Sequence, residues 1–347
     1  MNRLFFTLFF FLTIGFVYSQ SEFTGIYQIY KLPTSSRIAG LGGKAIAIPE
    51  VDINFATVNP SALTDTMSNQ FAMNYTGYLA GVKYGNFIYG YSLKERGNLA
   101  LGLQYLDYGS YDRKDEYGNL LGEWKGKDYV ISLIWSKELF EFFSIGASAK
   151  PLFSRLDIYK SFGIAFDLGA SFYNPKFGTM VSLVVKDLGK PIKPYFEELD
   201  EDFKHDIQLG VSTKLKYAPF RFSFVFHNLN RLDLLYKNKN VSEPNNTGLT
   251  PEVLEVDYSN KGLEQFFRHL IFGVEIIPVK SFYMQIGYNH QRRAELKIFE
   301  RPGMSGFSLG FGISIKKIKI GYAYSNYIPT NGTNHISIST NLSDVFR

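Results

Sequence analysis

Cysteine is absent from the sequence, and tryptophan is rare, with 2 residues in a chain of 347. The absence of cysteine excludes disulfide bonds, thiolate catalysis, zinc–thiolate sites and acylation of the lipoprotein type. Downstream of the first twenty residues, no segment approaches the roughly 18 apolar residues that a transmembrane helix needs. A mature chain that resides in a membrane must therefore cross it as a closed barrel, because only helices and closed barrels satisfy every backbone group in lipid.

Charge clusters and metal-ligand patterns are missing as well. The formal net charge is +5 and no cluster of Lys and Arg stands out, so nucleic acid is not an expected partner. The five histidines never fall at metal-ligand spacing, and no metal or other cofactor is expected. Residues 306–310 match the Gly-x-Ser-x-Gly spelling of a nucleophile elbow, but an alternating strand pattern continues directly after them. We therefore predict no catalytic residue and no enzymatic activity.

Aromatic residues are abundant, at 17% of the chain, yet the mean hydropathy is slightly negative at −0.09. Apolar residues are dispersed in alternating patterns, as in 307–315, where Phe, Leu and Ile alternate with Gly and Ser. A period of two with one apolar face is typical of a β-strand. The opposite faces carry mainly Gly, Ser and Gln rather than Lys and Glu, which favours a narrow, occupied barrel lumen over the wet face of a soluble sandwich.

The strand pattern predicts an all-β fold, a transmembrane antiparallel barrel of about 14 strands. The predicted strands are 71–78, 81–93, 98–106, 127–136, 143–151, 161–173, 177–186, 204–215, 219–228, 265–277, 281–291, 305–315, 317–327 and 334–341. The connections between them are expected to alternate between short inner turns and mostly long outer loops, which is typical of bacterial outer-membrane barrels. Strand 143–151 is the weakest of the set, because four small residues interrupt its pattern and Pro151 limits pairing.

The N-terminus reads as an export signal. Arg3 precedes the apolar stretch Leu4–Phe16, and the small Ser19 follows. We expect a signal peptide at 1–19, a hatch segment at 20–69 and a barrel at 70–347, with localisation to the cell outer membrane. An uncleaved N-terminal membrane anchor is the alternative.

The hatch is predicted from a glycine-rich segment that ends with an Asn-Pro pair before the first strand. Its spelling fails as a phosphate loop, because Ile38 and Ala45 stand where Gly and Ser or Thr are required. Glycines are expected to permit tight backbone turns inside the lumen. The hatch residues singled out are Leu32, Pro33, Arg37, Gly40, Gly42, Gly43, Asn59 and Pro60.

Two further groups of residues are candidates for function. Charged side chains on the inferred inner faces of strands are Asp167, Lys214, Arg221 and Glu275. Such residues are functional candidates in a membrane, although in a barrel they commonly pair with each other or with a plug. Large apolar groups in outer loops suggest partner docking, and the candidates are Trp124, Tyr195, Phe196 and Phe203, together with the loop 229–264.

The chain resembles the PorV/PorQ family of the type IX secretion system, distant relatives of the FadL-type barrels. The resemblance rests on residues 32–43 and 59–63, on 78–81, 115–124 and 167–169, and on 218–229, and it is nearer to the PorQ type than to PorV. Members often have Ser-Ala-Arg where this chain has Ser35-Ser36-Arg37. The resemblance implies a non-enzymatic barrel with a hatch that holds a PorZ-like protein at the surface, with PorU-like and PorV-like partners. Membrane lipid and lipopolysaccharide would be further partners.

The main alternative is a FadL-like transporter of hydrophobic small molecules across the outer membrane. It requires a continuous apolar pocket from the outer loops to a lateral opening. A predicted inner face of Gly, Ser, Gln and scattered charge disfavours that pocket.

Overall fold

The computed structural model describes residues 27–196, 203–231, 233–234, 261–296, 303–328 and 331–345. The expected signal peptide at 1–19 lies outside these residues, as does much of the predicted loop 229–264. No helix within the described ranges has the length and apolar character needed to cross a membrane.

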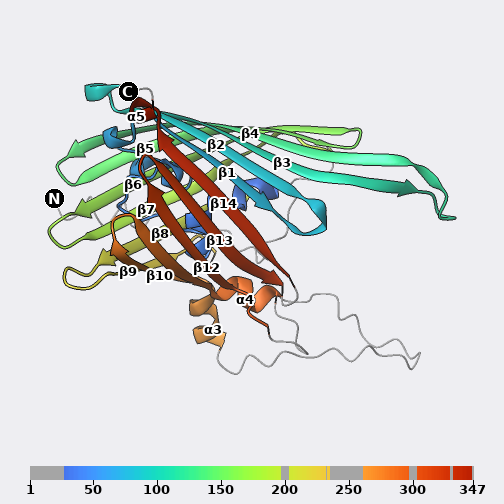
Figure 1. Ribbon diagram of the computed structural model, residues 1–347. Helices are drawn as coiled ribbons and strands as arrows, with labels where there is room; N and C mark the ends of the chain where they lie inside the picture. The colour runs from blue at the N-terminus through green and yellow to red at the C-terminus, as the bar shows by residue number, and fades with distance from the viewer. Residues whose placement is uncertain are drawn as a thin grey trace, which may run out of the picture.

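Fourteen antiparallel strands form one closed barrel, so the predicted fold class is confirmed (Figure 1). The ring closes where β1 pairs with β14, from Gln70 opposite Asn341 to Gly77 opposite Asn334. The strands are β1 (Gln70–Gly77), β2 (Lys83–Ser92), β3 (Asn98–Lys114), β4 (Leu120–Phe140), β5 (Phe143–Leu156), β6 (Tyr159–Asn174), β7 (Thr179–Lys193), β8 (Asp206–Lys214), β9 (Phe220–Phe226), β10 (Leu270–Val279), β11 (Phe282–Asn289), β12 (Phe307–Ile315), β13 (Ile318–Ile328) and β14 (Asn331–Asn341).

Alternation sorts the side chains into an apolar outer face and a buried inner face. On β12, Leu309 and Phe311 are 45% and 48% exposed. Ser308, which has the opposite parity, is 1% exposed. On β4, Leu133 is 57% exposed beside the buried Ser132. Exposed Leu, Ile and Phe recur on most strands, and such a continuous outer surface is stable only when lipid covers it.

The outer connections differ from the prediction. The segment 107–126 is not a loop but the extension of β3 and β4, which pair as far as Lys114 and Leu120 and project beyond the other strands (Figure 1). The expected loop 152–160 is likewise mostly strand, from β5 and β6. The prediction was wrong because it relied on the alternation of apolar and polar residues. Backbone pairing between the strands continues beyond the segment where that alternation ends.

Two predicted strand ends are helical instead. The segment 265–277 begins in α3 (Lys261–Arg268), and the segment 281–291 ends in α4 (His290–Leu296). Both helices lie on the side of the outer connections and contact each other. The inner turns are short, as predicted, and the C-terminal α5 (Leu342–Val345) lies on their side of the barrel (Figure 1).

The N-terminal segment fills the barrel interior with short helical elements, drawn in blue in Figure 1. These are η2 (Gln28–Lys31), α2 (Ser36–Gly40), η3 (Ile53–Thr57), η4 (Pro60–Ala62) and η5 (Asp65–Met67). A further short turn, η6 (Leu79–Gly81), follows β1, and η7 (Lys94–Arg96) forms an inner turn. The described part of the predicted hatch, 27–69, is therefore a folded plug inside the barrel.

Apolar cores join the hatch to the wall. Ile38, Leu41 and Phe55 of the hatch share one buried cluster with Val184, Val225 and Ile271 of the wall. A second cluster joins Ile53, Ala56, Leu63 and Met67 to Ala72, Ile88, Ala100 and Ile134. The predicted inner face of Gly, Ser, Gln and charge was thus incomplete, because inward-facing Val and Ile side chains bury against the hatch.

Candidate functional site

The hatch turns sharply after α2, where two of its predicted glycines are required. Gly42 and Gly43 have φ values of +92° and +97°, a backbone region that side chains with a Cβ rarely adopt. Gly40 ends α2, where an added Cβ would overlap the Gln285 side chain of β11. Pro33 is buried close to Gly43. The glycines therefore serve both the turn and the close approach of hatch to wall.

A buried ion-pair network ties the hatch to β9 and β10. Arg37 Nη2 lies 2.8 Å from Glu275 Oε1, and Arg221 Nη1 lies 2.7 Å from Glu275 Oε2. Arg221 also pairs with Glu50 of the hatch, and the Arg37 guanidinium lies 4.4 Å from the centre of the Tyr283 ring. The structure thus brings together the predicted hatch residue Arg37 and the predicted lumen charges Arg221 and Glu275. Their ion pairs link the hatch to the barrel wall.

A second network surrounds Asp167, and its central residue was missed by the sequence analysis. Lys150 Nζ lies 2.6 Å from Asp167 Oδ1 and 2.6 Å from Asp187 Oδ1. Tyr30 of the hatch donates its hydroxyl to the carbonyl of Lys150 at 2.8 Å. Gly146, Ser148 and Lys150 occupy every second position of β5. This alternation could have predicted from the sequence that Lys150 faces the lumen.

Within the part of the chain that the structure describes, the Lys214 side chain forms no ion pair with either network. It lies on the inward parity of β8 but at the last residue of that strand, and its side chain is exposed. Lys214 therefore has the predicted inward parity, but its side chain is exposed because β8 ends there.

Asn59 and Pro60 dock the hatch onto β5 and β6. Asn59 Oδ1 accepts from the Ser61 amide at 3.0 Å, and its Nδ2 donates to Ile46 O at 2.7 Å and to Ser171 Oγ at 3.0 Å. Pro60 lies so close to Gly146 that a Cβ added there would meet the Pro60 backbone. The small residues that interrupted the strand pattern of β5 are therefore the seat of η4.

Leu32 lies at the edge of a third apolar cluster, which contains the buried Ile29 and Tyr30 of the hatch. Phe203 belongs to this cluster and is 4% exposed, with its ring 5.1 Å from that of Tyr27. The prediction that Phe203 is an exposed docking residue is therefore wrong, because the hatch covers it.

The other docking candidates lie nearer the surface. Trp124 is on the projecting part of β4, where its ring stacks on Tyr111 at 4.9 Å. Phe196 is 45% exposed beside Tyr159, and Tyr195 is half-buried with its hydroxyl on Ser154. The stacked pair gives the projecting β3–β4 hairpin an aromatic surface.

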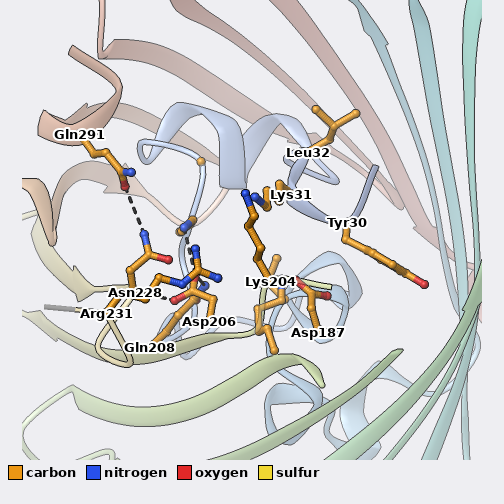
Figure 2. Close-up of a pocket in the computed structure, with 14 residues that line it drawn as sticks. Tyr30, Lys31, Leu32, Asp187, Lys204, Asp206, Gln208, Asn228, Arg231 and Gln291 are labelled. Carbon is orange, nitrogen blue, oxygen red and sulfur yellow. Dashed lines mark hydrogen bonds and ion pairs between the residues drawn. The ribbon is translucent and has the colours of Figure 1, made fainter. Parts of the chain in front are cut away.

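One cavity, which we call the polar cavity, opens between the hatch and the outer ends of β7 and β8 (Figure 2). It contains about 610 Å³ of space, part of it open to solvent. Most of its lining side chains are polar or charged. They are Tyr30, Lys31, Leu32, Gly43, Lys44, Val58, Lys186, Asp187, Lys204, Asp206, Gln208, Asn228, Arg231 and Gln291.

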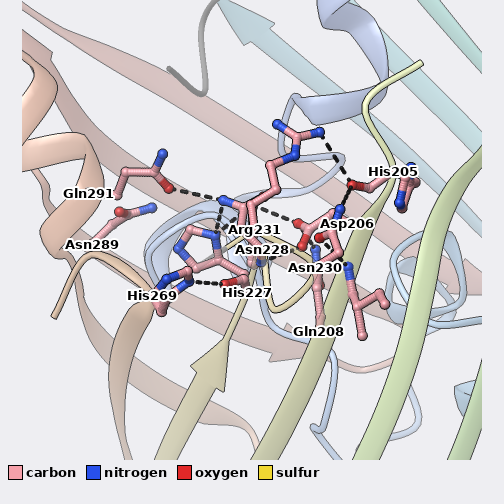
Figure 3. A network of polar contacts seen from close by, with 12 residues as sticks. His205, Asp206, Gln208, His227, Asn228, Asn230, Arg231, His269, Asn289 and Gln291 are labelled. Atoms are coloured by element: carbon pink, nitrogen blue, oxygen red, sulfur yellow. Dashed lines mark hydrogen bonds and ion pairs between the residues drawn. The ribbon is translucent and has the colours of Figure 1, made fainter. Parts of the chain in front are cut away.

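A group of hydrogen bonds supports one wall of the polar cavity and connects the start of β8, the residues after β9, the residue before β10 and α4 (Figure 3). Asp206 Oδ1 accepts from the Asn228 amide at 2.6 Å, and Asn228 Nδ2 contacts Gln291 Oε1 at 3.3 Å. His269 Nδ1 lies 2.8 Å from the carbonyl of His227. The wall is therefore held by polar contacts between segments far apart in the sequence.

A second cavity, near the inner side, is also lined mainly by polar residues, among them Ser36, Arg37, Asp52 and Lys319. Neither of these two cavities has the apolar lining that a hydrocarbon requires.

Comparison with models of protein families gives no match, and comparison with curated proteins gives none either. Solved structures do match. The toluene transporter TbuX of Ralstonia pickettii is 10% identical, with a TM-score of 0.53 over 91% of this chain and 100% of that chain. The toluene transporter TodX of P. putida is 10% identical, with a TM-score of 0.52 over 90% and 99%.

A deltaS2S3 mutant of TodX, described as a monoaromatic hydrocarbon channel, gives a TM-score of 0.54 at 10% identity, over 89% of this chain and 99% of that one. These similarities, all at 10% identity, establish the fold alone, which this chain shares with proteins described as transporters and as a channel. Together with the apolar outer surface, this fold fits the outer membrane.

Proposed function

We propose that this chain is a non-enzymatic outer-membrane barrel that acts through its outer face, where it anchors partner proteins at the cell surface. Its partners would be PorZ-like, PorU-like and PorV-like proteins of a type IX attachment complex, which processes cargo and attaches it to lipopolysaccharide. The motifs between residues 32 and 229 that resemble the PorV/PorQ family support this assignment.

The observation that carries the proposal is the closure of the barrel by its own hatch. Three apolar clusters and the Arg37–Glu275 pair fix the hatch to the wall, and the two cavities described are polar. A barrel closed in this way is a rigid platform. The β3–β4 hairpin, which projects from the platform with the Tyr111–Trp124 stack, offers a docking surface of the aromatic kind that dominates protein interfaces.

Pull-down from detergent-solubilised outer membranes tests the anchoring function. We expect the wild-type chain to recover a PorZ-like partner, and Trp124→Ala to lose most of it. Tyr217→Ala is the matched control, because Tyr217 is 91% exposed on an inner turn, away from the hairpin. Normal surface display of the partner and normal cargo attachment in a deletion strain would contradict the proposal.

Transport of hydrophobic small molecules is the second candidate, and the similarity to toluene transporters favours it. It predicts that the deletion strain takes up toluene or a long-chain fatty acid more slowly than its parent, with cargo attachment intact. The two functions therefore separate on the same pair of strains.

A further inference from the structure

Among the described residues that line the polar cavity, basic side chains outnumber acidic ones. Five basic residues line it, Lys31, Lys44, Lys186, Lys204 and Arg231, against two acidic ones, Asp187 and Asp206. Both carboxylates are already engaged, since Asp187 pairs with Lys150 at 2.6 Å and Asp206 pairs with Lys44 at 3.0 Å. Lys44 and Asp206 offset each other, and Lys150, which is outside the lining, offsets Asp187, so the remaining basic residues of the lining favour an anion.

Lys186 is half-buried and lines this cavity. A register shift between β6 and β7 coincides with a left-handed backbone at Asp187, whose φ is +59°. Such an irregularity lets two consecutive side chains, those of Lys186 and Asp187, line the same cavity. Within the described ranges, the Lys186 ammonium makes no hydrogen bond or ion pair.

Gln208 lines the same cavity and carries a buried acceptor. Its side chain is 2% exposed, and its Nε2 donates to Asp206 Oδ2 at 2.6 Å. That bond fixes the orientation of the amide and leaves Oε1 without a partner. A buried carbonyl oxygen without a donor is unfavourable, and a ligand hydroxyl would satisfy it.

We propose that the polar cavity binds a small oxyanion that carries a hydroxyl group, such as hydrogen phosphate or a short hydroxycarboxylate. Lys186 and Arg231 hold its negative oxygens, and Gln208 Oε1 accepts a hydrogen bond from its hydroxyl. The site is independent of partner anchoring, because its residues lie between the hatch and the wall rather than on the projecting hairpin.

Isothermal titration of the full chain in detergent tests the site with inorganic phosphate as the probe. We expect saturable binding to wild type, and a loss of affinity of about tenfold or more in Lys186→Met, since a charge-assisted contact is removed. Lys190→Met is the matched control, because Lys190 is exposed on the same strand. Absence of phosphate binding to folded wild-type barrel, or equal affinity in Lys186→Met, would overturn the proposal.

A second comparison tests whether Gln208 selects a hydroxyl group on the ligand. Wild type should bind lactate more tightly than propionate, which has no hydroxyl group, and Gln208→Met should remove that preference. If Lys186→Met fails to assemble, Arg231→Gln replaces it, because Arg231 lies outside the strands. Equal affinity for lactate and propionate in wild type would show that Gln208 does not select a hydroxyl group.

Discussion

Glu275 on β10 accepts from Arg37 of the hatch at 2.8 Å, and the two side chains are 1% and 8% exposed. They are separated by 238 residues in the sequence. The same carboxylate also holds Arg221 of the neighbouring β9 at 2.7 Å. One buried acid therefore pairs with two arginines and joins the plug to the wall, and Glu50 of the hatch supplies the second negative charge through its pair with Arg221.

Glu275→Gln should loosen the hatch. Removing one partner of a buried ion pair costs about 3–5 kcal/mol, because the remaining charges stay buried without compensation. We expect a lower unfolding temperature and faster proteolysis of the hatch in detergent. Glu138→Gln, at an exposed position of β4, is the control. An unchanged cleavage rate of the hatch in Glu275→Gln would show that the apolar clusters alone hold it.

Gly146→Ala should disturb the seat of η4. The added Cβ would overlap the backbone of Pro60, and overpacking of this kind costs about 1–3 kcal/mol. Gly85→Ala is the matched control, because a Cβ there meets only ordinary contacts at 3.9 Å or more. The free energy of unfolding in urea should fall for Gly146→Ala and stay nearly constant for Gly85→Ala. Equal values for the two variants would contradict the close docking of Pro60.

Leu133→Arg should impair membrane insertion. Leu133 is 57% exposed on the outer face of β4, and Arg at the midplane of a barrel costs about 2–4 kcal/mol. Folding into vesicles, followed by heat-modifiable gel mobility, measures the effect. Leu120→Arg is the control, since Leu120 is 65% exposed at the start of β4 on the projecting hairpin. Equal folding of both variants would argue against a lipid-covered band at Leu133.

Acid should weaken the contact between α3 and α4. Glu264 accepts from Arg268 Nε at 3.2 Å and contacts His290 Nε2 at 3.1 Å. Burial alone would raise the pKa of Glu264, but the hydrogen bond and charge of His290, with Arg268, lower it below the usual value. A carboxyl whose pKa is lower in the folded state than in the unfolded state stabilises the fold. This stabilisation is complete above the pKa of the unfolded state and is lost as the pH falls through the pKa of the folded state.

We therefore expect amide exchange in 261–268, corrected for intrinsic rates, to increase only below the ordinary pKa of a glutamate. Glu264→Gln should show fast exchange already at neutral pH, and Glu116→Gln should behave as wild type. Exchange in wild type that is constant down to about pH 3, well below the ordinary glutamate range, would rule out this role for Glu264.

The sequence by itself determined the barrel, the number of its strands and the direction in which most side chains face. These properties follow from the alternation of apolar residues with small or polar ones, a local pattern that is present in segments such as 307–315. It also indicated a plug, through Gly42, Gly43 and the Asn59–Pro60 pair. It misplaced the outer loops, because strand pairing in the β3–β4 hairpin continues where the local apolar pattern stops.

Only the tertiary structure decided which residues meet inside the lumen. The Arg37–Glu275 pair, the shared Lys150 and the polar cavity each join segments more than a hundred positions apart or on different strands. No local pattern encodes such a meeting, since it depends on closure of the barrel and on how the hatch lies within it. Phe203 is an example of what the local sequence does not predict. It follows an acidic stretch typical of an exposed loop, but the hatch covers it and makes it part of an apolar core.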